Sequence, residues 1–218
     1  YVSAVLASFS VNRLLKWQYL NNQAKLAIPE LSAEYLAEGI QVAMTDGLVP
    51  AFFPESIVYQ SYLRKLVRET GFLPLGGQPY GNVYFCDEGS GLIRDKLDRM
   101  GYRNEDSVWE DINEIDVLIV GDSIVAGMCV SREHTIAAEL ISNGLNSVSA
   151  ASPGNGPGEY ASIQKTFIPN VQPEIVVTVF HPNDRSNYYG NNFFRHYSKS
   201  KKVKEYLIKE GSSLKLND

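Results

Sequence analysis

The sequence is poor in cysteine and histidine, the residues that most often build metal centres. Only two cysteines and three histidines occur in 218 residues. Cys86 and Cys129 do not form a CxxC pair, so neither a zinc knuckle nor a disulfide scaffold is indicated, and the redox compartment stays open. No group of His, Asp and Glu has the spacing of metal ligands, so we expect no metal and no other cofactor.

An excess of charge of either sign is also missing. Apolar residues make up 44% and charged residues 21% of the chain, as in ordinary soluble proteins, which excludes disorder over the whole length. A net charge of −5 argues against general nucleic-acid binding. We interpret the acidic run from Glu105 to Glu114 as a solvated linker, because no histidine accompanies it. Five lysines near the end are interpreted as a solvated helix face: Lys199, Lys201, Lys202, Lys204 and Lys209.

The apolar N-terminal segment is too short to cross a bilayer. Residues 1–11 (YVSAVLASFSV) fall far below the roughly 20 residues that a membrane span needs. They are either the tail of a membrane segment or signal whose start is absent, or an amphipathic helix that continues to Trp17. The first interpretation implies membrane association through this segment.

Composition divides the chain into three predicted parts. Residues 1–70 predict a helical N-terminal extension. Its three helices are expected over residues 1–25, 32–44 and 55–69. Residues 71–115 predict an irregular leader that packs on the next domain and holds one convincing strand, at residues 82–86. Residues 116–218 predict an α/β domain with strand, loop and helix in alternation.

The stretch Val117–Val120 is the centre of that domain. Four branched apolar residues in a row predict a strand buried on both faces, as in the middle of a parallel sheet. Gly121 is expected to permit a backbone conformation that a residue with a Cβ would resist. Ser123 then lies at the carboxyl end of the strand, where α/β sheets bind ligands. It is either a nucleophile or the N-cap of the following helix.

Two further strands are expected to flank the central one. A helix at residues 135–142 leads to a strand at 146–151, and a glycine-rich loop leads to a helix at 159–167 and a strand at 174–180. This order predicts right-handed crossovers and a parallel sheet. With the strands ordered 2-1-3, the loops that follow them meet at one crevice.

That crevice would contain Ser123, Gly154 and Asn183. A hydroxyl, a glycine with an accessible N–H group and a side-chain amide suit acyl transfer. Ser123 would be the nucleophile, and the Ser123 N–H, the Gly154 N–H and the Asn183 amide would form an oxyanion hole.

On these residues the sequence resembles the SGNH (GDSL-type) hydrolases. Gly121-Asp122-Ser123, Gly154 and Asn183-Asp184 match three of the four family blocks in order and spacing, over roughly Leu73 to Tyr197. The resemblance implies a flavodoxin-like three-layer α/β/α fold with a parallel sheet and a serine esterase or acyltransferase that works through an acyl-enzyme. Gly101-Tyr102-Arg103-Asn104 is similar to the leader of bacterial members associated with cell-surface polysaccharides. It suggests O-acetyl esters of carbohydrates as substrates and a protein of the bacterial cell envelope or cytoplasm.

The chain departs from the family pattern in two places. His181 stands where the third block usually has a glycine, and the fourth block, Asp-x-x-His, is absent. His134, at a helix start, is expected at the surface, and His196 lies in an aromatic, polar loop. His181 is either a stand-in base or a structural residue. We expect the chain to be a fragment of a longer protein, with an incomplete sheet and with the base beyond Asp218.

Two other functions remain open. One is a non-catalytic binding domain that keeps the fold and has lost the base. The other is a phosphate cradle in a flavodoxin-like protein. The second is disfavoured, because neither GxxxxGK[ST] nor GxGxxG occurs and Asp122 would place negative charge beside a phosphate.

Overall fold

A computed structural model describes residues 45–50, 74–86, 92–182, 184 and 207–216. The three predicted N-terminal helices lie outside these residues, as do Asn183, His196 and four of the five clustered lysines. In the part of the chain that is described, no helix is both long and apolar enough to cross a membrane.

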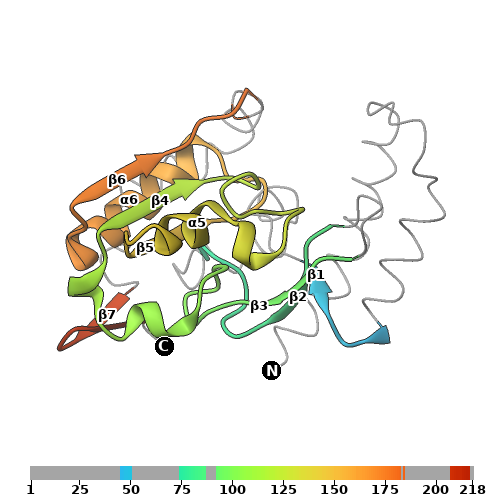
Figure 1. Ribbon diagram of the computed structural model, residues 1–218, viewed down its shortest axis with the longest axis horizontal. Coiled ribbons are helices and arrows are strands. Elements are labelled where there is room, and N and C mark those ends of the chain that lie inside the picture. The colour runs from blue at the N-terminus through green and yellow to red at the C-terminus, as the bar shows by residue number, and fades with distance from the viewer. Residues whose placement is uncertain (1–44, 51–73, 87–91, 183, 185–206, 217–218) are drawn as a thin grey trace, which may run out of the picture.

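The centre of the molecule is a parallel three-stranded sheet (Figure 1). Its strands are β4 (Val117–Gly121), β5 (Ser147–Ala151) and β6 (Ile175–Thr178), in the order β5-β4-β6. Val117 pairs with Ser147 on one side and with Ile175 on the other. All five residues of β4 are buried. The predicted order, the parallel pairing and the burial of the central strand are therefore confirmed.

Helices cover the two faces of this sheet. Leu118 and Val120 of β4 share one hydrophobic cluster with α6 (Pro157–Val171), whereas Val117 and Ile119 belong to a second cluster with Ala137 of α5 (Ile136–Ser142). Alternate residues of a strand point to opposite faces, which explains this division. The described domain is thus of mixed α/β class, with helices packed on both sides of the sheet.

Local signals account for both helices. Thr135 caps α5, because its side chain accepts a hydrogen bond from the Ala138 N–H at 3.3 Å, and a single turn, η3 (Arg132–His134), precedes it. Glu159 accepts from the Gly156 N–H at 3.0 Å and so caps α6. The helix predicted at residues 159–167 is two residues longer at its start and four at its end, with Pro169 in its last turn.

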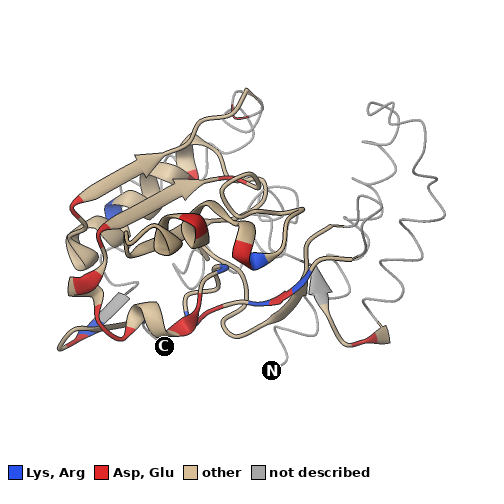
Figure 2. Ribbon diagram, in the orientation of Figure 1, with Lys and Arg blue, Asp and Glu red and all other residues tan. Residues whose placement is uncertain are grey.

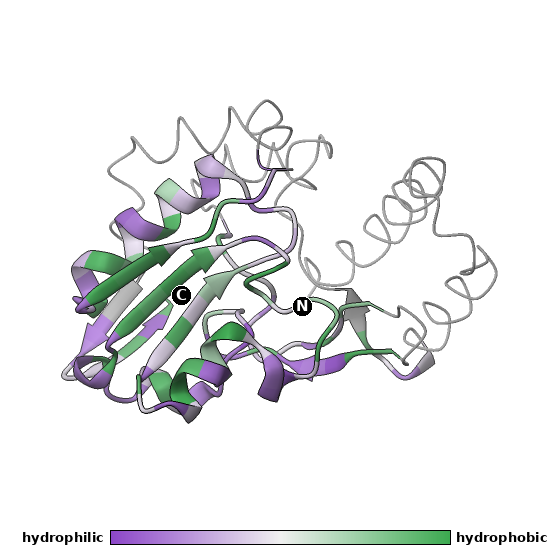
Figure 3. Ribbon diagram, turned by 45° about the horizontal axis from the view of Figure 1, so that its top comes forward, coloured by the Kyte–Doolittle hydropathy of each residue, from purple (hydrophilic) through white to green (hydrophobic). Residues whose placement is uncertain are grey.

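Strand β6 is less buried than its sequence suggests. Ile175, Val176 and Val177 are 48%, 39% and 39% exposed, although they are as apolar as the residues of β4. Among the described strands, β6 pairs only with β4. Figure 3 shows it as a hydrophobic strand beside β4. Its apolar surface is therefore available for further packing.

The leader contains more strand than the sequence predicts. The predicted strand is present as β2 (Asn82–Tyr84), which pairs in parallel with β1 (Val49–Pro50) and antiparallel with β3 (Arg94–Lys96). The sequence of β3 alternates in charge, as Figure 2 shows. Its strand conformation comes from pairing with β2, since Arg-Asp-Lys has no strand preference of its own.

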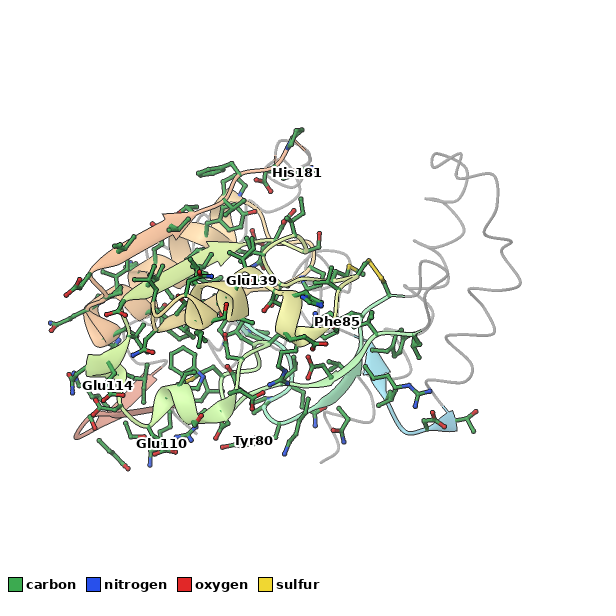
Figure 4. The ribbon with its side chains drawn as sticks, in the orientation of Figure 1. Tyr80, Phe85, Glu110, Glu114, Glu139 and His181 are labelled. Atoms are coloured by element: carbon green, nitrogen blue, oxygen red, sulfur yellow. A yellow bond between two sulfur atoms is a disulfide. The ribbon has the colours of Figure 1, made fainter. Side chains whose placement is uncertain are left out.

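A disulfide joins the leader to the segment after β4. Cys86 and Cys129 are bonded, with their Cα atoms 5.4 Å apart although the two residues are 43 positions apart in the sequence (Figure 4). The expectation that these cysteines form no disulfide framework is corrected here. Their spacing carries no signal, and only the fold brings them together.

The acidic run at the end of the leader is not a linker. It forms two short 3-10 helices, η1 (Asp106–Trp109) and η2 (Ile112–Glu114). Trp109 and Ile112 are fully buried, and the Trp109 ring lies 5.8 Å from that of Phe167 in α6. The acidic side chains, among them Glu110 and Glu114, point outward (Figure 4). The prediction considered only the charged face and missed the apolar one.

Asp98 is the polar centre of the leader. Its carboxylate accepts hydrogen bonds from the N–H groups of Met100 and Tyr102, from the Asn104 amide and from Trp109 Nε1, each at 2.8 Å. Burial raises the pKa of Asp98 to about 6, against the four donors, which by themselves would lower it. Asn104 in turn bonds the backbone N–H and C=O of Ser149 in β5. The leader is thereby fixed to the sheet by satisfied polar groups as well as by its core.

The described C-terminal residues form a hairpin that the sequence did not predict. Its strands are β7 (Leu207–Glu210) and β8 (Ser213–Leu216). Leu214 is fully buried in the cluster that contains Trp109, and the Ile112 N–H donates to the Ser212 carbonyl at 2.9 Å. Lys209, interpreted as part of a helix face, lies on a strand instead.

Candidate active site

Ser123 lies in a tight turn at the carboxyl end of β4. The chain runs from residue 122 to 130 in successive turns, and no regular helix begins at the serine. Asp122, not Ser123, makes the capping contact, because Asp122 Oδ1 accepts from the Ile124 N–H at 3.0 Å. The alternative in which Ser123 is the N-cap is therefore wrong. Ser123 is half-buried, and within the described residues neither its Oγ nor its N–H takes part in a hydrogen bond.

Gly121 is required by a close contact rather than by an unusual backbone conformation. Its φ is not positive, so the expected reason is corrected. A Cβ at this position would lie 2.3 Å from Cγ2 of Val125 and 2.8 Å from its Cβ. Val125 is fully buried beneath the turn. The absent side chain lets the turn fold back over the end of the strand.

Gly154 lies at the corresponding end of β5. Its φ of +80° is the left-handed conformation that glycine adopts without strain. Its N–H has no acceptor in the described part of the chain. The next residue, Asn155, is fully buried, and its amide donates to the Gly121 carbonyl at 3.0 Å. This bond ties the Gly154 loop to the strand end that carries Ser123.

Tyr160 connects the loops after all three strands. Its hydroxyl donates to Asp184 Oδ1 at 2.8 Å. Burial, this hydrogen bond and the charges of Asp122, Asp184 and Glu159 all raise the pKa of Tyr160 above its ordinary value of 10, so that the phenol remains a proton donor. Asp122 follows β4, Glu159 follows β5 and Asp184 follows β6. Two direct bonds, from Tyr160 to Asp184 and from Asn155 to the Gly121 carbonyl, link the segment after β5 to the residues after β6 and to the end of β4.

The third loop is described on both sides of Asn183. Asp184 is buried, and its Oδ2 accepts from the His181 N–H at 2.7 Å. Asn183 itself lies outside the described residues, so its predicted place in the oxyanion hole stays a prediction. The flanking turn is nevertheless anchored through Asp184 to Tyr160.

One carboxylate oxygen at the site is buried without a partner. Asp122 is 1% exposed, and its Oδ2 has no hydrogen bond to the described residues, whereas its Oδ1 accepts from the Ile124 N–H. An unpaired buried acceptor is costly, so it marks a place where a donor would be favoured.

Neither described histidine contacts the serine. His134 is exposed, with Nδ1 3.6 Å from Glu139 Oε1, which confirms the predicted surface position. His181 is exposed at the tip of the segment after β6 (Figure 4). No hydrogen bond joins either one to Ser123. His196 lies outside the described residues.

The described residues contain no cluster of His, Cys, Asp and Glu with metal-binding geometry. Among the described residues, the site combines the Ser123 hydroxyl and the Ser123 and Gly154 N–H groups, none of which is hydrogen-bonded there, with buried carboxylates around the Tyr160 phenol.

The prediction missed three structural supports of this site. Asn155 lies in the predicted glycine-rich loop, directly after Gly154, and Tyr160 lies in the predicted helix that follows. The available signal was a polar residue beside the glycine of a predicted turn. Arg103 was noted as part of a leader motif, without a role. Comparison with known proteins identifies no relative: no family model, no curated protein and no solved structure matches the chain.

Proposed function

We propose that the protein is a serine esterase or acyltransferase of the SGNH (GDSL-type) kind. The observation that carries the proposal is the placement of Ser123 and Gly154 just after two adjacent parallel strands, each with a backbone N–H that makes no hydrogen bond to the described residues. Such N–H groups are the donors that an oxyanion hole needs. One donor typically contributes roughly 3–4 kcal/mol in the transition state.

In the proposed mechanism, Ser123 Oγ attacks the carbonyl carbon of an ester. The Ser123 proton passes to a general base, and negative charge collects on the former carbonyl oxygen, where the Ser123 and Gly154 N–H groups and the Asn183 amide bind it. Collapse of this intermediate expels the alcohol and leaves an acyl-enzyme on Ser123. Water or a second hydroxyl then takes the acyl group. Carbohydrate O-acetyl esters are the proposed substrate class.

We further propose that the parallel sheet belongs to a flavodoxin-like three-layer fold that extends past β6. The exposed apolar residues of β6 support this extension, because a strand of that composition is normally covered on both faces. The proposed base would lie on that extension, since neither described histidine is bonded to Ser123.

The direct test is the Ser123→Ala variant with a short-chain aryl ester. Loss of the hydroxyl should abolish hydrolysis while the melting temperature stays near that of the wild type, because Ser123 Oγ makes no hydrogen bond to the described residues. Ser107→Ala, at an exposed serine of η1, is the matched control and should retain full activity. Unchanged turnover in Ser123→Ala would exclude the proposal.

The second candidate is a binding domain without catalysis. The absence of a hydrogen bond between Ser123 and either described histidine favours it. It predicts that an acetylated oligosaccharide raises the melting temperature while a serine-directed phosphonate leaves Ser123 unlabelled.

A further inference from the structure

Three interactions cross from the leader to the segment that follows Ser123. Arg103 donates from Nη1 to the carbonyls of Gly127 and, at 3.4 Å, Ala126. The Cys86–Cys129 disulfide joins the same two parts of the chain, and Arg132 reaches back to Asp95 of β3. Together they enclose the turn that presents the serine.

Arg103 is buried, and its guanidinium has partners at Nε, at Nη1 and on one face. It is 3% exposed, its Nε lies 2.6 Å from Asp95 Oδ2, and its guanidinium carbon lies 4.6 Å from the centre of the Phe85 ring. The planar guanidinium can serve a carboxylate, two carbonyls and a ring at once, which an ammonium group cannot do. The cost of burying this charge is offset by a specific set of partners, all of them in the leader or in the serine segment.

Asp95 fixes the guanidinium from the leader side. Burial alone would raise the pKa of Asp95, but hydrogen bonds and charges from Arg132 and Arg103 outweigh burial and lower it. The carboxylate is therefore ionised at neutral pH and holds both arginines. Gly127, whose carbonyl Arg103 binds, has a φ of +64°, and a Cβ there would lie 2.6 Å from Thr135 Cγ2, so the turn requires glycine at this position.

The bonded carbonyls belong to the turn itself. The Ala126 N–H donates to the Asp122 carbonyl at 3.0 Å, and the Met128 N–H donates to the Ser123 carbonyl at 3.0 Å. Fixing the peptide groups of 126 and 127 therefore restricts the backbone on both sides of Ser123. An oxyanion hole loses efficiency when its donors shift by a fraction of an ångström, so this restriction bears on the Ser123 N–H.

We propose that Arg103 is a positioning residue for the nucleophile: through the carbonyls of residues 126 and 127 it holds the Ser123 turn in its reactive geometry. The proposal rests on the proposed serine chemistry for its catalytic part. Its structural part, the restraint of the turn, stands on the contacts alone.

The test compares Arg103→Lys with Arg99→Lys, with the disulfide kept oxidised in both. Lysine at 103 retains the charge for Asp95 and loses the separate Nη1 group that donates to the carbonyls of Ala126 and Gly127. Arg99 is a matched control, because it also pairs with two acidic residues, Asp106 and Glu110, but does not touch the serine turn. The readouts are fluorophosphonate labelling of Ser123, separated into the maximal rate and the half-saturating concentration, and amide hydrogen exchange of residues 124–130.

For Arg103→Lys we expect a maximal labelling rate at least tenfold lower, a half-saturating concentration within twofold of the wild type, and faster exchange across residues 124–130. Arg99→Lys should change neither quantity by more than twofold. Unchanged exchange in Arg103→Lys would overturn the restraint, and faster exchange with an unchanged labelling rate would overturn its catalytic part.

Failure of the proposed function has a different signature. If the wild type is labelled neither as the 218-residue chain nor as a longer chain extended past Asp218, the serine chemistry is excluded, and hydrogen exchange alone then decides whether Arg103 restrains the turn. If Arg103→Lys does not fold, Phe85→Leu removes the ring beneath the guanidinium and keeps its hydrogen bonds. A roughly threefold loss in labelling rate is expected of it, and an unchanged rate with unchanged exchange would contradict the proposal.

Discussion

Replacing Gly121 with alanine tests why the chain turns where it does. The new methyl group would overlap Val125 Cγ2 at 2.3 Å, and both residues are fully buried. Overpacking of this kind costs about 1–3 kcal/mol, and we expect the upper half of that range because both partners are fixed in the core. For a chain of this size, about 2–3 kcal/mol lowers the melting temperature by roughly 4–12 °C.

The contact also predicts how the defect can be repaired. Val125→Ala alone removes two methyl groups and should cost about 1.5–3 kcal/mol. In the double variant the overlap with Val125 Cγ2 disappears and only the 2.8 Å contact with the Cβ of residue 125 remains, so adding Gly121→Ala to Val125→Ala should cost clearly less than Gly121→Ala costs in the wild type. Urea unfolding of the four proteins measures the cycle. A Gly121→Ala variant as stable as the wild type, or a double variant in which the two losses simply add, would refute the close-contact explanation.

Two further predictions concern the leader. Trp109→Phe removes the hydrogen bond from Nε1 to the buried Asp98 carboxylate and also removes some packing. It should lower the free energy of unfolding, measured in urea, by about 2–4 kcal/mol. A loss below about 1 kcal/mol would contradict this role of the Trp109 hydrogen bond. Asp95→Asn leaves Arg103 buried beside a neutral group and should cost about 3–5 kcal/mol at pH 7. Because the pKa of Asp95 is lowered in the folded state, its stabilisation is present above the ordinary pKa of 3.8 and is lost as the pH falls through the lowered value. The two unfolding curves should therefore converge in acid, and a constant difference down to pH 2 would argue against the ion pairs.

The sheet was predictable because its signals are local. Four branched residues before Gly121 indicate a buried strand, and Thr135 with Asn143-Gly144 marks the start and the end of α5. The alternation of strand and helix indicated a parallel sheet, and the 2-1-3 order was taken from the doubly wound arrangement of such sheets. These rules need no knowledge of distant contacts.

The leader was predicted poorly because its structure depends on distant contacts. Strand β3 is a strand only through its pairing with β2, and Trp109 is buried only because α6 and the C-terminal hairpin cover it. The disulfide joins residues 43 positions apart. None of these contacts leaves a periodic pattern in the sequence.

At the candidate site, Ser123 and Gly154 could be predicted from the sequence. The residues that hold their loops in place could not. Ser123 and Gly154 follow strands whose neighbours could be inferred, so their convergence was expected. The bond from Asn155 to the Gly121 carbonyl and the link from Tyr160 to Asp184 depend on side-chain directions that only the folded chain defines.

The most direct measurement is intact-mass labelling with a fluorophosphonate probe, applied to the 218-residue chain and to a longer chain extended past Asp218. The proposed chemistry predicts one adduct, mapped to Ser123, in at least the longer chain and none in Ser123→Ala. Labelling of both chains would place a base within these residues and make His181 and His196 the next substitutions; labelling of the longer chain alone would place the base on the added segment. An absence of any adduct at Ser123 in both chains would contradict the proposed esterase and favour the binding domain.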